Sequence, residues 1–229
     1  MRGAFTRALV VLALLFSPLV AIGQTSGLVA AYNFNEGIGT TVTDASGNGN
    51  NGTLNSGVTW STLGKFGNAL SFNGTSGLVT IPDTASLRLT NAMTLEAWVF
   101  PTSHAGSWRD VIYKGNDNYF LEGQSSQNGA PAVGGTFGQT FGTGPLVLNT
   151  WTHLAVTYDR ATLRLYINGV QISSVARTAS IATSTNPLQI GGDSIYGQYF
   201  QGLIDEVRVY NRALSAAEVS TDMNRAVVS

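Results

Sequence analysis

The sequence contains no cysteine in its 229 residues. This absence excludes a disulfide scaffold, a zinc site built on thiolates and a cysteine nucleophile. Charged residues are also scarce, since they make up 11% of the chain, against roughly 25% in an average protein. Long surface helices and coiled coils, which need many Glu and Lys residues, are therefore disfavoured.

The chain also lacks an excess of positive charge. Its 12 Lys and Arg residues are balanced by 13 Asp and Glu residues, so the formal net charge is −1. A surface of this kind has no long-range attraction for nucleic acid or for an anionic membrane, and we expect neither as a partner. Glycine, in contrast, is abundant, with 27 residues, which favours many turns and a soluble all-β protein.

An N-terminal segment has the composition of a secretory signal peptide. Arg2 and Arg7 give it a positive start, and residues 8–16 form an unbroken apolar run. Residues 21–23 then supply the small side chains that precede a cleavage site. A transmembrane anchor, the alternative, needs about 20 apolar residues. We therefore predict a cleaved signal peptide over residues 1–23 and a mature chain that is secreted, either extracellular or periplasmic, without a membrane attachment.

The rest of the chain consists of short apolar segments separated by Gly, Asn and Ser clusters, a pattern typical of strands and turns. Residues 163–167 alternate apolar and polar side chains, as a half-buried strand does, and Asn168-Gly169 favours a tight hairpin turn. The only helix signal is a capping box at Ser215 and Glu218, which predicts a helix over residues 215–225.

These elements predict an all-β fold of two antiparallel sheets, a jelly-roll sandwich with a short C-terminal helix. A parallel α/β fold is disfavoured because the sequence provides no crossover helices. No linker, charge run or internal repeat divides the chain. We therefore predict a single domain over residues 24–229, with its core at about residues 27–225.

A metal site is suggested by the loop at residues 44–52, which carries short oxygen-bearing side chains and three glycines. Calcium takes six to eight such oxygens, although an ordinary Asx-rich turn has the same composition. Asp205 adds weight, because strand alternation places its carboxylate in line with Val207 and Val209, on an apolar face. A buried carboxylate requires a metal or other partners, and here the alternatives are Arg212 or the backbone amides of a neighbouring turn.

A ligand-binding surface is suggested by large aromatic residues in loops rich in Gly and Ser, where they are hard to bury. Trp108 lies in one such loop, Tyr196 and Tyr199 lie in another, and Asp117 follows Asn116 in a third. Aromatic faces ringed by carboxylates and amides are what a carbohydrate site needs. The alternative is that these aromatic side chains only cap the ends of the sandwich.

Seven motifs in order resemble the laminin-G-like, concanavalin A-like jelly-roll domains of secreted proteins, and the resemblance covers roughly residues 27–225. The motifs are Ala31-Tyr-Asn-Phe-Asn-Glu36, Asp44-Ala-Ser-Gly-Asn-Gly49, Gly67-Asn-Ala-Leu-Ser-Phe-Asn-Gly74, Thr94-Leu-Glu-Ala-Trp-Val99, Trp151-Thr-His-Leu-Ala-Val-Thr-Tyr-Asp159, Leu165-Tyr-Ile-Asn-Gly169 and Gly202-Leu-Ile-Asp-Glu-Val-Arg-Val-Tyr-Asn211. The resemblance implies that the first and last strands are neighbours. It also implies a structural calcium ion whose ligands are carried onto Asp44, Asn48, Asn51 and Asp205.

Catalytic motifs of enzymes with this architecture are missing from the sequence. The Glu-x-Asp-x-x-Glu strand of laminarinase-like glycosidases and the Gln-x-His motif of alginate lyases are both absent. His104 and His153 are the only histidines; we expect a structural role for His153 and an exposed, unreactive position for His104 in the loop at residues 102–108. A hydrolase would have to use Glu96 and Glu122, if these two carboxylates face one surface.

The favoured function is therefore a secreted, non-catalytic recognition module for a polysaccharide or a glycoprotein glycan, stabilised by calcium. Its predicted ligand-binding residues are Trp108, Asp117, Tyr196 and Tyr199. Two alternatives stay open at this point. One is a structural or adhesive domain that binds protein, and the other is a polysaccharide-degrading lyase or hydrolase of an unrecognised type.

Overall fold

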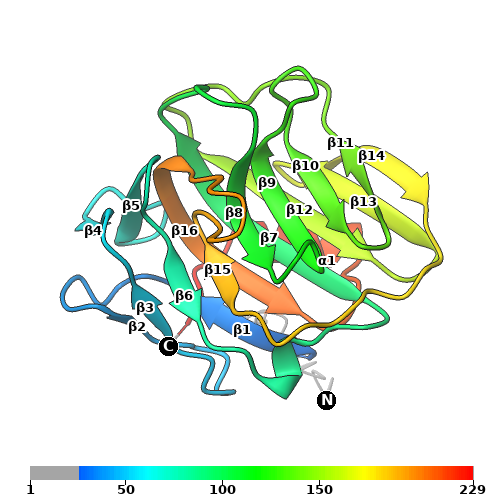
Figure 1. The fold of residues 1–229 in the computed structure, drawn as a ribbon, viewed down its shortest axis with the longest axis horizontal. Helices are drawn as coiled ribbons and strands as arrows, with labels where there is room; N and C mark the ends of the chain where they lie inside the picture. Colours follow the sequence, from blue (N-terminus) through cyan, green and yellow to red (C-terminus); the bar gives the residue numbers. More distant parts are fainter. Residues whose placement is uncertain (1–25, 229) are drawn as a thin grey trace, which may run out of the picture.

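Two antiparallel β-sheets packed face to face form the protein, as predicted (Figure 1). The computed structural model describes residues 26–228, so the predicted signal peptide at residues 1–23 lies outside the described residues. Sheet A has the order β14 (Val170–Ala176), β13 (Thr162–Ile167), β12 (Thr152–Tyr158), β7 (Met93–Pro101), β16 (Gln201–Tyr210), β5 (Ala69–Asn73) and β4 (Val58–Ser61), with β1 (Leu28–Tyr32) also paired to β16.

Sheet B forms the second layer. Its order is β11 (Gly138–Phe141), β10 (Ala132–Gly135), β9 (Tyr119–Gln124), β8 (Arg109–Lys114), β15 (Leu188–Ile190), β6 (Val79–Ile81), β3 (Gly52–Leu54) and β2 (Thr41–Val42). The helical elements are the 3₁₀ turn η1 (Ala85–Leu87) and the helix α1 (Ala216–Met223). Within residues 26–228, no helix has the length and apolar character needed to cross a membrane.

The main core lies between the two sheets and follows the period-2 alternation of the strands. On β9, Tyr119 and Leu121 point into this core, while Phe120 and Glu122 lie on the outer face. Phe137 stacks on Tyr158 across the core, with ring centroids 4.1 Å apart. Each sheet therefore has an outer face of its own, and these two faces differ in composition.

Local signals in the sequence placed the turns and the helix correctly. Asn168 (φ 49°) and Gly169 (φ 76°) form the tight turn between β13 and β14, since both adopt the left-handed conformation that this turn requires. The capping box is also present, because the Ser215 hydroxyl accepts from the Glu218 amide and the Glu218 carboxylate accepts from the Ser215 amide. β1 and β16 are neighbours, as the family resemblance implied.

The predicted face of Asp205 is wrong because β16 contains a bulge. Asp205 pairs with Trp98 of β7, and Arg208 pairs with Glu96, so one residue of β7 faces two residues of β16. Glu206 takes a left-handed conformation (φ 55°) at this point. The bulge shifts the alternation by one residue, so that Val207 points into the core while Asp205 lies on the outer face of sheet A.

Candidate functional site on the outer face of sheet B

The predicted calcium loop is tied to β1 by hydrogen bonds. The Asp44 carboxylate accepts from the backbone amides of Ala31, Ser46 and Asn50, each at 2.9 Å. It accepts a fourth bond from the Ser46 hydroxyl at 2.8 Å. Asn48 donates to the carbonyl oxygens of Leu28 and Val29, both at 3.0 Å. The loop thus has the hydrogen bonding of an Asx-rich turn.

The other two predicted calcium ligands have protein partners as well. The Asn51 carboxamide oxygen accepts from the Asp44 amide at 2.9 Å. The Asp205 carboxylate accepts from the amides of Phe66 at 3.0 Å and Glu206 at 2.8 Å, the type of backbone partner considered as the alternative to a metal. In the part of the chain that the structure describes, no three His, Asp or Glu side chains are grouped so as to hold a metal ion. The calcium site stays a prediction.

Three of the four predicted ligand-binding residues meet at one pocket of about 240 Å³ on the outer face of sheet B. Trp108, Asp117 and Tyr196 line it, although they come from three separate loops. Tyr199 does not line this pocket, since its ring packs over Gly192 and its carbonyl accepts from the Arg109 guanidinium. The remaining lining residues are Phe120, Glu122, Gly135, Gln139 and Gln198.

Aromatic rings form much of the surface around this pocket. Tyr113, Phe120 and Ala132 form a small apolar cluster on the outer face, and Trp108 and Phe141 pack against it. The rings of Trp108 and Phe141 lie 6.5 Å apart, in a tilted arrangement. Tyr113 and Phe120 are themselves buried, so the cluster supports the partly exposed ring of Trp108, which lines the pocket.

Two loops hold polar groups at the rim of the pocket. In the turn between β8 and β9, Asp117 is in the left-handed conformation (φ 54°), and its carboxylate accepts from the Tyr113 hydroxyl at 3.1 Å. In the loop before β16, the Asp193 carboxylate accepts from the amides of Ile195, Tyr196 and Gln198. These bonds fix the backbone at Tyr196, whose side chain is 52% exposed.

The two loops are also joined directly across the rim. The Tyr196 hydroxyl donates to the side-chain oxygen of Asn116 at 2.9 Å and lies 3.4 Å from an Asp117 oxygen. The Tyr196 ring meets the Tyr113 ring edge to face at 6.4 Å. The rim is therefore preorganised by contacts between side chains and does not depend on a ligand to form.

A pair of buried carboxyl groups includes one residue of the pocket lining, Glu122, and its neighbour Asp110. Asp110 and Glu122 are register partners on β8 and β9, and their exposed fractions are 0% and 3%. Neither Asp110 oxygen has a hydrogen-bond donor among the described residues. Burial, with the neighbouring carboxyl groups, raises the pKa of Asp110 well above its usual range, and burial raises the pKa of Glu122 to about 8. At neutral pH the pair therefore retains a proton.

The pair of glutamates considered for a hydrolase is not assembled. Glu96 is on β7 and lies on the outer face of sheet A, whereas Glu122 is on β9 and lies on the outer face of sheet B. The sandwich separates the two carboxyl groups, so they cannot act on one bond. The sequence did not reveal Asp110 as a site residue. Its one signal was a carboxylate directly before the apolar residues Val111 and Ile112.

His153 is buried, consistent with the structural role expected for it, and His104 lies exposed in its loop, as expected from the sequence. A ring nitrogen of His104 lies 2.8 Å from the Leu146 carbonyl oxygen, so His104 joins two loops. His153 is buried on the outer face of sheet A, where its ring contacts the Trp98 ring at 5.3 Å between centroids. Burial, together with the charges of Arg208 and Lys65, lowers the pKa of His153 to about 3, so its imidazole is neutral at physiological pH.

The two-sheet sandwich has a match among known protein families. The profile described as the concanavalin A-like lectin/glucanases superfamily matches residues 73–220. The chain belongs to this superfamily.

The solved structures with a similar fold include domain 4 of AbnA, a GH43 extracellular arabinanase from Geobacillus stearothermophilus, in complex with arabinotriose. It is 25% identical in sequence, with a TM-score of 0.69, over 86% of this chain and 98% of that chain. Trypanosoma rangeli sialidase is 17% identical, with a TM-score of 0.67, over 90% of this chain and 35% of that chain. At this low identity, the sialidase shows a shared fold alone.

Two further proteins are similar to this chain. The binding domain of Paraclostridial Mosquitocidal Protein 1 is 19% identical, with a TM-score of 0.70, over 87% of this chain and 52% of that chain. Among curated proteins, Pappalysin-1 of Mus musculus is 30% identical over 78 residues, which are 32% of this chain and 5% of that protein. The match thus spans a small part of that relative.

Proposed function

We propose that this protein is a non-catalytic carbohydrate-recognition domain and that the pocket on the outer face of sheet B is its binding site. The observation that carries the proposal is the composition of that pocket, where the rings of Trp108, Phe120 and Tyr196 are combined with carboxyl and carboxamide groups. Aromatic faces pack against the C–H surfaces of a sugar ring, while polar groups at the rim pair with its hydroxyls.

The pocket residues have separate roles in this proposal. Trp108, which is partly buried against Phe141, is the stacking surface. Asp117 and the carboxamides of Gln139 and Gln198 exchange hydrogen bonds with sugar hydroxyls. Tyr196 closes one side of the rim. The similarity to an arabinanase domain solved with arabinotriose supports a sugar ligand and makes arabino-oligosaccharides the first probes to use.

A hydrolase is the second candidate, and one observation favours it. Glu122 lines the pocket, and its raised pKa keeps its carboxyl group protonated at neutral pH, which is what a general acid requires. A glycosidase needs a second, ionised carboxylate across the scissile bond. Asp117 is the other carboxylate in the lining, but the sequence contains neither the Glu-x-Asp-x-x-Glu strand nor the Gln-x-His motif of enzymes with this architecture. Recognition without turnover is therefore the favoured proposal.

Isothermal titration calorimetry with arabino-, xylo-, manno- and cello-oligosaccharides tests the proposal. Trp108→Ala is expected to weaken binding at least roughly tenfold, as the loss of a central aromatic contact does. Trp151→Ala is the matched control, because Trp151 is partly buried beside Phe100 away from this pocket. Equal affinity of the wild type and Trp108→Ala, or no binding to any of these sugars, would contradict the proposal. Release of reducing ends would favour the hydrolase.

Calcium binding and secretion are the finer parts of the proposal. They rest on the composition of the Asp44 loop and of the N-terminal segment. In the described residues, the four hydrogen bonds to Asp44 satisfy its carboxylate without a cation. A thermal melt with and without chelator is the test, since a native-state ligand at about 100 times its Kd adds ~2.7 kcal/mol. An unchanged midpoint would remove calcium from the proposal.

A further inference from the structure

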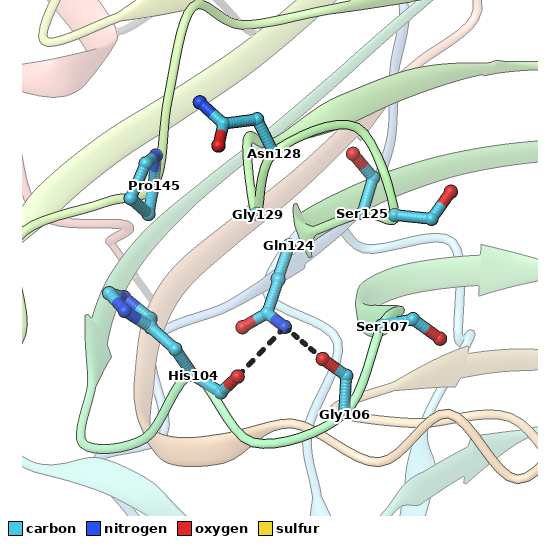
Figure 2. A pocket seen from close by; sticks show the side chains of 9 residues that line it. His104, Gly106, Ser107, Gln124, Ser125, Asn128, Gly129 and Pro145 are labelled. Carbon is cyan, nitrogen blue, oxygen red and sulfur yellow. Dashed lines mark hydrogen bonds between the residues drawn. The ribbon is translucent and has the colours of Figure 1, made fainter.

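A second pocket, of about 400 Å³, lies where β9 ends. It is bounded by the loop before β8 and the loop after β9, as Figure 2 shows. Most of its lining is polar and small. The lining residues are His104, Gly106, Ser107, Gln124, Ser125, Ser126, Asn128, Gly129 and Pro145.

Gln124 is the buried polar group of this second pocket. Its amide nitrogen donates to the carbonyl oxygens of His104 at 3.2 Å and Gly106 at 2.6 Å, drawn as dashed lines in Figure 2. Its carboxamide oxygen has no donor among the described residues, although the residue is only 5% exposed. The two bonds fix the orientation of the amide, so the free oxygen is held in place as an acceptor.

The two pockets lie along one strand. Phe120 and Glu122 lie on the outer face of β9, and Gln124 is the last residue of the same strand, just beyond an irregularity in the pairing of β9 with β8. The first two residues line the first pocket and Gln124 lines the second, and the distance from Phe120 to Gln124 is about 13 Å along a strand. The loop before β8 separates them, since Ser107 lines one pocket and Trp108 lines the other.

The charge of these linings selects among sugars. The first pocket is lined by the carboxyl groups of Asp117 and Glu122, with Asp110 buried beside Glu122. Neither lining contains Lys or Arg. A sugar that carries a carboxylate would meet the Asp117 carboxylate without a cation in either lining to pair with, and it would disfavour ionisation of Glu122, whereas an uncharged sugar avoids both effects.

We infer that the two pockets are subsites of one extended site for an uncharged oligosaccharide, in which the Gln124 carboxamide oxygen accepts a hydrogen bond from a sugar hydroxyl at the second subsite. This inference rests on the proposed function, because the first pocket supplies the primary sugar contact. The second subsite adds affinity only when the ligand is long enough to reach it. A ligand of one sugar ring uses the first pocket alone.

The test is calorimetry with arabino-, xylo- and manno-oligosaccharides of increasing length, from one ring to five. Wild-type affinity is expected to increase with the length of the oligosaccharide. In Gln124→Met, which removes the acceptor, this gain in affinity with length is expected to be roughly tenfold smaller than in the wild type. Because Gln124→Met also removes two loop hydrogen bonds, Ser126→Tyr is the second variant. It fills the pocket from an exposed position and leaves Gln124 intact. Both variants are expected to bind single rings as the wild type does.

Three results would overturn the inference. They are a wild-type affinity that does not grow with length, long oligosaccharides that bind both variants as tightly as the wild type, or galacturonate oligomers that bind more tightly than neutral ones. Trp108→Ala separates this failure from that of the proposed function. If Trp108→Ala loses binding while the second-pocket variants keep it, only the extended site is wrong; if Trp108→Ala binds every sugar normally, the proposed function fails.

Discussion

The two outer faces of the sandwich both bury carboxyl groups, but the segments that cover these groups differ. On sheet A, the chain covers its own polar residues with α1 and the segment that follows it. On sheet B, Asp110 and Glu122 are covered by loops that leave two pockets open beside them. The closed face, on sheet A, is covered by the chain itself, whereas the open face, on sheet B, has two pockets. On both faces some buried carboxyl oxygens have no donor among the described residues, as at Glu96 and Asp110.

On the closed face, internal partners reach some of the buried polar groups, while both oxygens of Glu96 have no donor among the described residues. The Arg208 guanidinium donates to the Arg225 carbonyl at 2.6 Å and to Glu206 at 3.4 Å. The Tyr210 hydroxyl donates to Asp222 of α1 at 2.5 Å, and the indole of Trp98 donates to the Met223 carbonyl at 3.1 Å. A cation and the C-terminal segment thus supply partners here, whereas no Lys or Arg lines either pocket of the open face.

The largest expected effect comes from breaking the closed face. Arg208→Met removes the cation that faces Glu206, a carboxyl group with 0% exposure. Burial raises the pKa of Glu206 to about 8, so the experiment is done at about pH 9, where both groups are ionised. Loss of one partner from a buried ion pair typically costs about 3–5 kcal/mol. The free energy of unfolding, measured by urea denaturation, is expected to fall by that amount, while the surviving folded protein keeps its sugar affinity. A loss below about 1 kcal/mol would show that the pair has little structural weight.

The pH dependence of stability tests the buried carboxyl groups on the outer face of sheet B. The pKa of Glu122 is about 8 in the folded protein, above the usual 4.5 of this carboxyl group, so the folded state binds the extra proton between these two values. The stabilisation that comes from this bound proton is fully present below pH 4.5, decreases as the pH rises, and is lost above about pH 8. Glu122→Gln removes this contribution, and its melting temperature is expected to vary less than that of the wild type across this range.

The groups that face Glu122 determine how this titration is interpreted. They are Asp110 on β8, Asp193 in the loop before β16 and Asp117 in the turn between β8 and β9. Asp110→Asn serves as the companion variant, because it removes the nearest carboxyl group and leaves Glu122 in place. If Glu122→Gln and the wild type have parallel pH profiles, Glu122 does not titrate in this range.

The smallest expected effect on the fold comes from the rim. Tyr196→Ala removes a half-exposed ring that contacts Tyr113 and Asn116. Sugar affinity, measured by calorimetry, is expected to fall by up to roughly tenfold. The free energy of unfolding is expected to change by no more than about 0.5 kcal/mol, as at most surface positions. A large loss of stability with unchanged affinity would assign Tyr196 to the fold instead of the site.

Sequence patterns predicted what depends on neighbouring residues. The strand alternation at residues 163–167, the Asn168-Gly169 turn and the capping box at Ser215 are local signals, and the structure confirms each of them. Trp108, Asp117 and Tyr196 were identified because aromatic and acidic side chains in glycine-rich loops are hard to bury. That these three residues line one pocket could not be predicted from the sequence, because it depends on how the fold brings their loops together.

Other features depend on pairings that a sequence does not display. The bulge at Glu206 reversed the face expected for Asp205, because one extra residue shifts the alternation beyond it. Asp110 and Gln124 could not be predicted as site residues because they lie within apolar strands. Their positions beside the pockets depend on the pairing of β8 with β9 and on the loops around these strands. Glu96 and Glu122 were separated only when their strands were assigned to different sheets.

The position of β16 has a consequence for how the protein acquires its structure. This late strand lies between β7 and β5 and also pairs with β1, so three segments from the first half of the chain depend on one that is synthesised near the end. Pairing over such sequence separations makes folding slow, because the closure of long loops must precede the contacts that reward it. A nascent chain that ends before Gln201 therefore has its β5 and β7 edges unpaired, and sheet A is completed only after translation has passed Tyr210.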